Sequence, residues 1–221
     1  MQQRRESKKR ETRQRISDVA TALFFERGYD DVTVDEIAIA AQVSKMTIFN
    51  YFARKEELIL DREDDLKLLP FQRALSGRPA GQTPVDALRA LVADMNRQKH
   101  PLCHISALTV DWWRVVDASP ALKSRLRELA DEAAEGIATA LAGTPTGAHP
   151  DGATRLMAGM IVLTVRTARE EALRQMHTRA SAKKANTAFL QLMEQGLSIL
   201  EQLREIKPKT PVKQAGSGLP S

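Results

Sequence analysis

The stretch that decides the fold runs from Thr33 to Lys55 and reads TVDEIAIAAQVSKMTIFNYFARK. It begins with a hydroxyl residue, Thr33, followed three positions later by the acid Glu36, and this pair predicts a capping box at a helix start. Apolar residues then recur at helical spacing until Gln42-Val43 interrupts them. Ser44 follows as a cap for a second helix, so the stretch predicts two short helices joined by a tight turn.

The second of these helices is short and has a mixed outer surface. Ile48 and Phe52 are four residues apart, so both point to the same inner side. A helix of this length is too short to persist by its own hydrogen bonds. A helix-turn-helix places such a surface in the major groove of DNA. The residues left on the outer side are Lys45, Met46, Thr47, Phe49, Asn50 and Tyr51.

The pattern Gln-Val-Ser-Lys-x-Thr-Ile-Phe-x-Tyr-Phe-x-x-Lys-Glu-Glu-Leu resembles the DNA-binding signature of the tetracycline-repressor (TetR-type, AcrR-like) family of bacterial transcriptional regulators. The resemblance is close over residues 32–59, and the rest of the chain is similar only in helix order and length. Two positions depart from the family's pattern. Phe49 stands where the family usually has tyrosine, so the resemblance implies the loss of a phosphate-binding hydroxyl and allows an apolar contact to sugar or to a thymine methyl group. Met46 stands where glycine or proline is common. Both departures concern which bases are read.

The resemblance implies a role for each side chain at the DNA. Thr33 and Thr47 would bind phosphate through their hydroxyls and through amides at helix N-termini. Lys45 would contact guanine, and Asn50 would reach adenine or a backbone oxygen. Tyr51 and Lys55 would also bind phosphate. The full expected set is Thr33, Ser44, Lys45, Met46, Thr47, Phe49, Asn50, Tyr51 and Lys55.

The chain has 221 residues and a net charge of +5, with 28% charged and 43% hydrophobic residues, as in a globular protein. Residues 1–15 carry seven Lys and Arg against two Glu, and seven minus two equals the whole net charge. Beside the motif, this favours a basic arm on phosphate over a solubilising tail. One cysteine allows no internal disulfide, and no signal peptide or membrane span is evident, so we expect a cytoplasmic protein.

Helical periodicity and breaks predict an all-α fold of about nine helices, with a three-helix head and a helical body. The first helix should run from about Lys9 to Arg27 and stop at Gly28. A helix from Lys55 should kink or end at Pro70, and later helices should follow Thr83-Pro84 and Ser119-Pro120. The expected parts are a head with a basic arm (residues 1–54), an effector-binding and dimerisation body (55–206) and a disordered tail (207–221).

Two long helices, at about 153–176 and 182–206, end the body. The section from Leu156 to Leu163 is apolar on all sides, which predicts burial on more than one face. Gly196 would let another backbone approach closely. The resemblance implies that these helices form a four-helix bundle with a second copy, giving a homodimer. The alternative is that they close a monomeric bundle.

A small-molecule effector pocket between helices of the body is expected. Its candidate residues are Met95, Cys103, Leu108, Trp112, Met157, Met160, Leu163 and Arg166. Arg166 and Arg169 either bind an anionic effector or pair with acids such as Asp131 or Glu135.

Metal and enzyme chemistry are disfavoured. His100, Cys103 and His104 are metal-ligand types, but Asp111 is the nearest downstream carboxylate and Pro101 interrupts a helix that would align the histidines. No phosphate-binding glycine loop, nucleophile elbow or zinc-protease motif is present. No cofactor, metal or catalytic residue is therefore expected.

These features favour a dimeric transcriptional repressor that binds a palindromic double-stranded DNA operator. A small molecule would release it by shifting the helix that follows Lys55. The alternatives are an activator, a regulator without a small ligand, and a helical enzyme.

Overall fold

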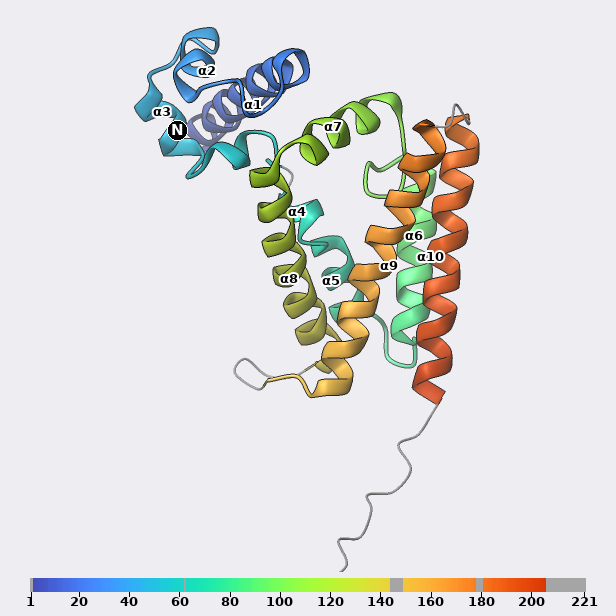
Figure 1. Cartoon of the computed structure of the whole chain (residues 1–221). Coiled ribbons are helices and arrows are strands. Elements are labelled where there is room, and N and C mark those ends of the chain that lie inside the picture. The colour runs from blue at the N-terminus through green and yellow to red at the C-terminus, as the bar shows by residue number, and fades with distance from the viewer. Residues whose placement is uncertain (1, 62, 144–148, 178–180, 206–221) are drawn as a thin grey trace, which may run out of the picture.

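The structure, a computed structural model, describes residues 2–61, 63–143, 149–177 and 181–205. These residues form ten α-helices and one 3-10 helix, and no strand occurs among them, which confirms the all-α prediction (Figure 1). The head comprises α1 (Gln2–Arg27), α2 (Val34–Ala40) and α3 (Lys45–Tyr51). The body follows η1 (Lys55–Leu58) and comprises α4 (Glu63–Leu66), α5 (Leu69–Ser76), α6 (Pro84–Arg97), α7 (Ala107–Ala118), α8 (Pro120–Ala142), α9 (Gly152–His177) and α10 (Ala182–Glu205).

The head has a small apolar core at which its three helices meet. Phe24 of α1, Ile37 of α2 and Ile48 of α3 are at most 1% exposed, as is Phe52 just after α3. Gly28 ends α1 with φ +91, in the left-handed region that glycine adopts cheaply, and its amide donates to Phe24 O at 2.9 Å. These contacts fix the angle at which α3 is presented.

The first helix starts earlier than predicted. It begins at Gln2 rather than near Lys9, so the expected basic arm is the first part of α1. Lys8, Lys9, Arg10 and Arg15 of this part are exposed to solvent.

The prediction of one helix from Lys55 to Pro70 is wrong, because the segment is broken twice. Leu58, Ile59 and Leu60 are all at most 4% exposed, and three consecutive residues cannot face one side of an α-helix. The chain leaves η1 there and enters α4 only at Glu63. Leu68 then adopts φ +52 between α4 and α5. Pro70 lies in the first turn of α5, where its missing N–H costs nothing.

In the body, α9 and α10 run side by side, with α8 against α9 and α6 against α10 (Figure 1). Both long helices were predicted closely. Gly196 of α10 lies directly against the side chain of Thr164 of α9, so the space left by this glycine is filled by a side chain of the same chain rather than by another backbone.

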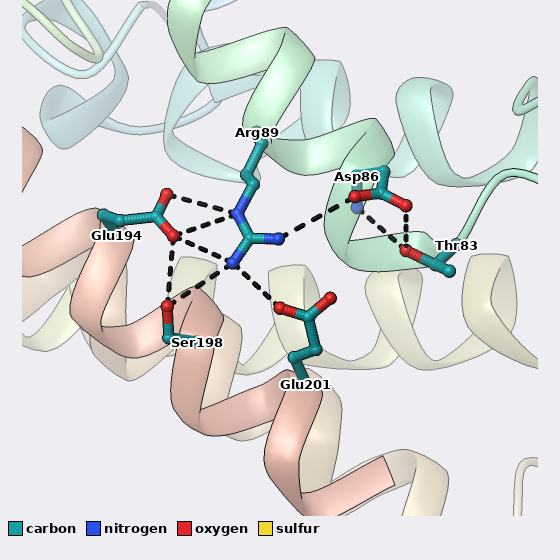
Figure 2. A network of polar contacts seen from close by, with 6 residues as sticks. All are labelled: Thr83, Asp86, Arg89, Glu194, Ser198 and Glu201. Atoms are coloured by element: carbon teal, nitrogen blue, oxygen red, sulfur yellow. Dashed lines mark hydrogen bonds and ion pairs between the residues drawn. The ribbon is translucent and has the colours of Figure 1, made fainter. Parts of the chain in front are cut away.

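A polar network holds α6 to α10 (Figure 2). Arg89 of α6 contacts Glu194 at 2.8 Å and Glu201 at 3.0 Å, both on α10. Asp86 lies 3.8 Å from the same guanidinium, and its backbone amide donates to the hydroxyl of Thr83, the residue that caps α6. One arginine thereby fixes α10 along the side of α6.

Part of the apolar surface of α9 and α10 remains exposed. Within Leu156–Leu163, only Ala158 and Ile161 are buried, whereas Leu156 is 64% and Leu163 is 49% exposed. The single chain therefore buries one face of this section, and burial of a second face stays a prediction that requires a second copy. Ile199 and Leu203 of α10 are also exposed. The predicted tail (207–221) lies outside the described residues.

Candidate nucleic-acid interface

The start of α2 is held by the predicted capping box. Thr33 Oγ1 accepts from the Glu36 amide at 3.2 Å, and Glu36 Oε2 accepts from the Thr33 amide at 2.7 Å. The Thr33 amide, the Thr33 hydroxyl and the Arg27 guanidinium together lower the pKa of Glu36 to about 2. Because the Thr33 hydroxyl also donates to Glu36 at 2.7 Å, it would have to leave that carboxylate to bind a phosphate.

The turn and the start of α3 are equally well defined. Gln42 adopts φ +54, and the amide of the partly buried Val43 donates back to Ala38 O at 3.0 Å. Ser44 caps α3 as predicted, since its Oγ accepts from the Thr47 amide at 3.0 Å. The two hydroxyls of Ser44 and Thr47 also bond to each other at 2.8 Å.

The outer surface of α3 exposes four of the six side chains predicted there, and the other two, Thr47 and Tyr51, are partly buried. Met46 is 70% and Phe49 is 45% exposed, and Asn50 is exposed beside them. Tyr51 is partly buried against the head core. Lys45 projects towards α2, where its Nζ pairs with Asp35 Oδ2 at 2.8 Å, and both side chains are more than half exposed.

Lys55 differs from its expected setting. Its Nζ donates to Tyr29 O at 2.6 Å and lies 4.2 Å from the centre of the Tyr29 ring. Burial lowers the pKa of this ammonium, and the nearby acids Asp30 and Glu56 oppose that shift. A phosphate contact by Lys55 would therefore require the side chain to leave this site.

Arg13 was predicted to lie in the basic arm, but its side chain forms contacts within the protein. Its Nε donates to Asp61 Oδ1 at 2.8 Å, and its guanidinium also donates to Tyr51 O at the end of α3. The same group lies 4.2 Å above the Phe52 ring. Arg13 thus connects α1, the end of α3 and the segment after η1. No local pattern signals this role, because its partners are far away in sequence.

Several hydrogen bonds connect the head to the body. Trp112 Nε1 of α7 donates to Ile59 O at 3.1 Å. Ser119, which is 1% exposed, caps α8 and donates to Asp30 Oδ1 of the head at 3.0 Å. Within the head, Ser17 Oγ of α1 donates to Leu58 O at 3.1 Å. The corner between α7 and α8 therefore bonds directly to the loop that precedes α2.

The expected effector residues do not come together in one enclosed pocket. Met95 and Cys103 are buried against each other, with their sulfur atoms 3.7 Å apart. Leu108 is 67% exposed, and Leu163 and Arg166 also face solvent, so these three cannot wall an enclosed pocket in one chain. Trp112, Met157 and Met160 are partly buried against the core.

The two arginines of α9 do not have the predicted partners. Arg166 pairs with Glu170 of its own helix at 3.6 Å rather than with Asp131 or Glu135. The Arg169 guanidinium lies 4.0 Å above the Trp113 ring, and burial lowers its pKa to about 10. Its buried Nε has no hydrogen-bond partner among the described residues.

The histidines and cysteine singled out for metal binding have other contacts. His100 Nδ1 accepts from the Leu102 amide at 3.3 Å, and its Nε2 lies 3.7 Å from Asp65 Oδ1. Cys103 is buried, and this raises the pKa of its thiol to about 12. In the part of the chain that is described, no three His, Cys, Asp or Glu side chains are grouped to hold a metal ion, and no helix could cross a membrane.

Residues 16–61 match the family model for bacterial regulatory proteins of the tetR family. The chain is 39% identical over 84 residues to the HTH-type transcriptional regulator TcmR of Streptomyces glaucescens, covering 38% of this chain and 37% of TcmR. It is 44% identical over 50 residues to the uncharacterized HTH-type transcriptional regulator YdeS of Bacillus subtilis, covering 23% of this chain and 25% of YdeS. The matches thus span less than two-fifths of either relative.

Solved structures resemble the fold over most of its length. SmeT of Stenotrophomonas maltophilia, in complex with triclosan, has a TM-score of 0.58 at 19% identity, covering 85% of this chain and 90% of SmeT. NalD, the secondary repressor of the MexAB-OprM multidrug efflux pump of Pseudomonas aeruginosa, has a TM-score of 0.53 at 18% identity, covering 85% of this chain and 97% of NalD.

Proposed function

We propose that the chain, whose residues 16–61 match the tetR family of bacterial regulatory proteins, is a transcriptional repressor of that family and binds a palindromic operator as a homodimer. We further propose that a small molecule bound in the body releases it. The observation that carries the proposal is the outer surface of α3. Its inner residues Ile48 and Phe52 are buried, while Lys45, Met46, Phe49 and Asn50 stand outside on a fixed helix.

At the operator, α3 lies in the major groove. Lys45 exchanges Asp35 for the O6 and N7 acceptors of a guanine. Asn50 reaches an adenine or a backbone oxygen, and Tyr51 with the hydroxyls of Thr33 and Thr47 binds phosphate. The exposed cations in the first part of α1 add contacts to phosphate that do not depend on sequence.

Dimerisation uses α9 and α10. The exposed Leu156, Leu163, Ile199 and Leu203 give these helices apolar surface that the single chain leaves in water. Two copies of the chain related by a two-fold axis along this surface bury it against each other. The dimer then presents two copies of α3 to two operator half-sites, which lie about 34–36 Å apart or a multiple of that distance. The effector occupies the body and acts on the head through the bonds at Asp30 and Ile59. SmeT, which shares this fold, forms a complex with the small molecule triclosan.

The test is fluorescence anisotropy of the purified protein on DNA from upstream of its own gene, with scrambled DNA as reference, at several salt concentrations. We expect tight binding to the upstream DNA, and at least about a fivefold loss in Lys45→Ala, since one good base contact contributes about 1–3 kcal/mol. Lys183→Ala is the matched control, because it removes an exposed lysine of the body.

Equal and steeply salt-dependent binding to both DNAs would overturn the proposal that this upstream region holds the operator. Unchanged affinity and base preference in a folded Lys45→Ala variant would overturn the role of Lys45. Once an operator is known, compounds are screened for release of the labelled DNA.

A further inference from the structure

Met46 and Phe49 form an apolar surface at the centre of α3. They are three residues apart on α3, so their side chains are neighbours on one face. Both are large and exposed, at 70% and 45% of their surface. Neither side chain belongs to the apolar core of the head, which Ile48 and Phe52 help to form. Their placement therefore points to a contact outside the chain.

The polar groups around this pair are largely engaged within the protein. Lys45 is bonded to Asp35, and the Thr47 hydroxyl is bonded to Ser44. The Asp35 carboxylate adds a negative charge next to the only lysine of α3. This surface is consequently poorly suited to general phosphate binding. Its side chains without a described hydrogen bond or ion pair within the protein are Met46, Phe49 and Asn50.

From this geometry we propose that Met46 and Phe49 read the C5-methyl groups of thymine in the major groove, so that the operator half-site carries thymines opposite this pair. Thymine is the only base that presents a methyl group in the major groove, and apolar side chains recognise it by burying it from water. This inference rests on the proposed function, since it names the bases that the same surface selects.

A protein partner is a poorer occupant for the same surface. The pair is flanked on its own helix by the polar residues Lys45 and Asn50, and it includes only two apolar side chains. The larger exposed apolar surface of this chain lies in the body, on α9 and α10. DNA fits the narrow apolar strip with polar neighbours, because base edges in the groove alternate methyl groups with hydrogen-bonding atoms.

The experiment begins with selection of an operator from random-sequence duplexes by the full-length protein. Each thymine of the selected sequence is then replaced by deoxyuridine, which lacks only the methyl group. We expect a loss of about fourfold in affinity per contacted methyl, and about sixteenfold when the symmetric positions of both half-sites are replaced. Uracil at positions outside the contact should have no effect.

The protein variants assign the effect to the two side chains. In Met46→Ala and Phe49→Ala the thymine and uracil operators should bind with nearly equal affinity at the position that each residue reads. Met46→Leu keeps an apolar side chain and should keep the discrimination, and Asn50→Ala should keep it as well. Because all these side chains are exposed, circular dichroism should show the same helix content in each variant.

The outcomes separate this inference from the function on which it rests. If no sequence is enriched in the selection, specific DNA binding itself fails. If a sequence is enriched but uracil replaces thymine without loss everywhere, or if the alanine variants discriminate as the wild type does, the methyl-reading inference is overturned while the DNA-binding function stands.

Discussion

Replacement of Gly196 by alanine tests the packing that fixes α9 against α10. A Cβ built at Gly196 would lie 2.9 Å from Thr164 Cβ and closer still to Thr164 Cγ2 and Oγ1. These atoms sit at the base of a branched side chain, so relief requires the two helices to separate. Overpacking of this kind costs about 1–3 kcal/mol, and removing a helical glycine returns about 0.5–1 kcal/mol. The difference between these ranges is about 0–2.5 kcal/mol. Because all three contacts of this Cβ would be shorter than 3.0 Å, we expect the net loss of unfolding free energy in the upper part of that range, at about 1–2 kcal/mol.

Thermal unfolding followed by circular dichroism should show this loss as a decrease of about 2–8 °C in Tm for a chain of this size. Protein concentration must be equal in all samples, because a dimer's Tm depends on it. Thr164→Ala combined with Gly196→Ala removes the two shortest contacts and should recover most of the loss. Gly136→Ala is the matched control, since the atoms nearest to its Cβ are the end of the flexible Gln72 side chain, which can turn away by giving up its hydrogen bond to Lys67 O.

Two results would refute this reasoning. One is a Gly196→Ala variant as stable as the wild type. The other is a double variant that shows no recovery. Either would mean that α9 and α10 are not held as closely at Thr164 as the structure indicates.

Three further predictions concern the head and the cysteine. Asp35→Asn frees Lys45 and should raise affinity for operator and scrambled DNA by about two- to fivefold in anisotropy titrations; unchanged binding would show that the ion pair does not restrain Lys45. The fold lowers the pKa of Glu36 to about 2 from the ordinary 4.5, so its stabilising contribution is complete above pH 4.5 and is lost as pH falls towards 2. Acid titration of Tm should therefore be shallower in Glu36→Gln, and equal slopes would contradict the capping role. Burial raises the pKa of Cys103 to about 12, so iodoacetamide at pH 8 should alkylate the folded chain at least about tenfold more slowly than the urea-unfolded chain, as measured by mass spectrometry, and equal rates would contradict this burial.

Local signals predicted much of the head. The capping box at Thr33, the cap at Ser44 and the glycine stop at Gly28 each depend on residues within a few positions, and all three occur as predicted. The inner and outer sides of α3 follow in the same way from helical spacing. The long helices of the body were also found, because Ser119-Pro120 and similar breaks mark their ends.

Features that depend on distant contacts were not predictable from local pattern. Arg13 is held by Asp61 and Tyr51, which only the folded head brings to it. Lys55 turns inward because the Tyr29 carbonyl and ring lie beside it. The break at Leu68 requires the left-handed backbone conformation, which leucine rarely adopts, so no sequence signal marks this break. Effector residues were chosen by chemical type alone, which does not determine whether they meet.

The bonding of Ser119 has a thermodynamic consequence for regulation. This residue ends α7, begins α8 and holds Asp30 of the head, so the orientation of the head depends on the angle between two body helices. Coupling between two binding sites is reciprocal. If an effector lowers the affinity of the proposed repressor for DNA by a given factor, bound DNA lowers its affinity for the effector by the same factor. The effector concentration needed for release would therefore rise with the number of operator copies that a cell holds.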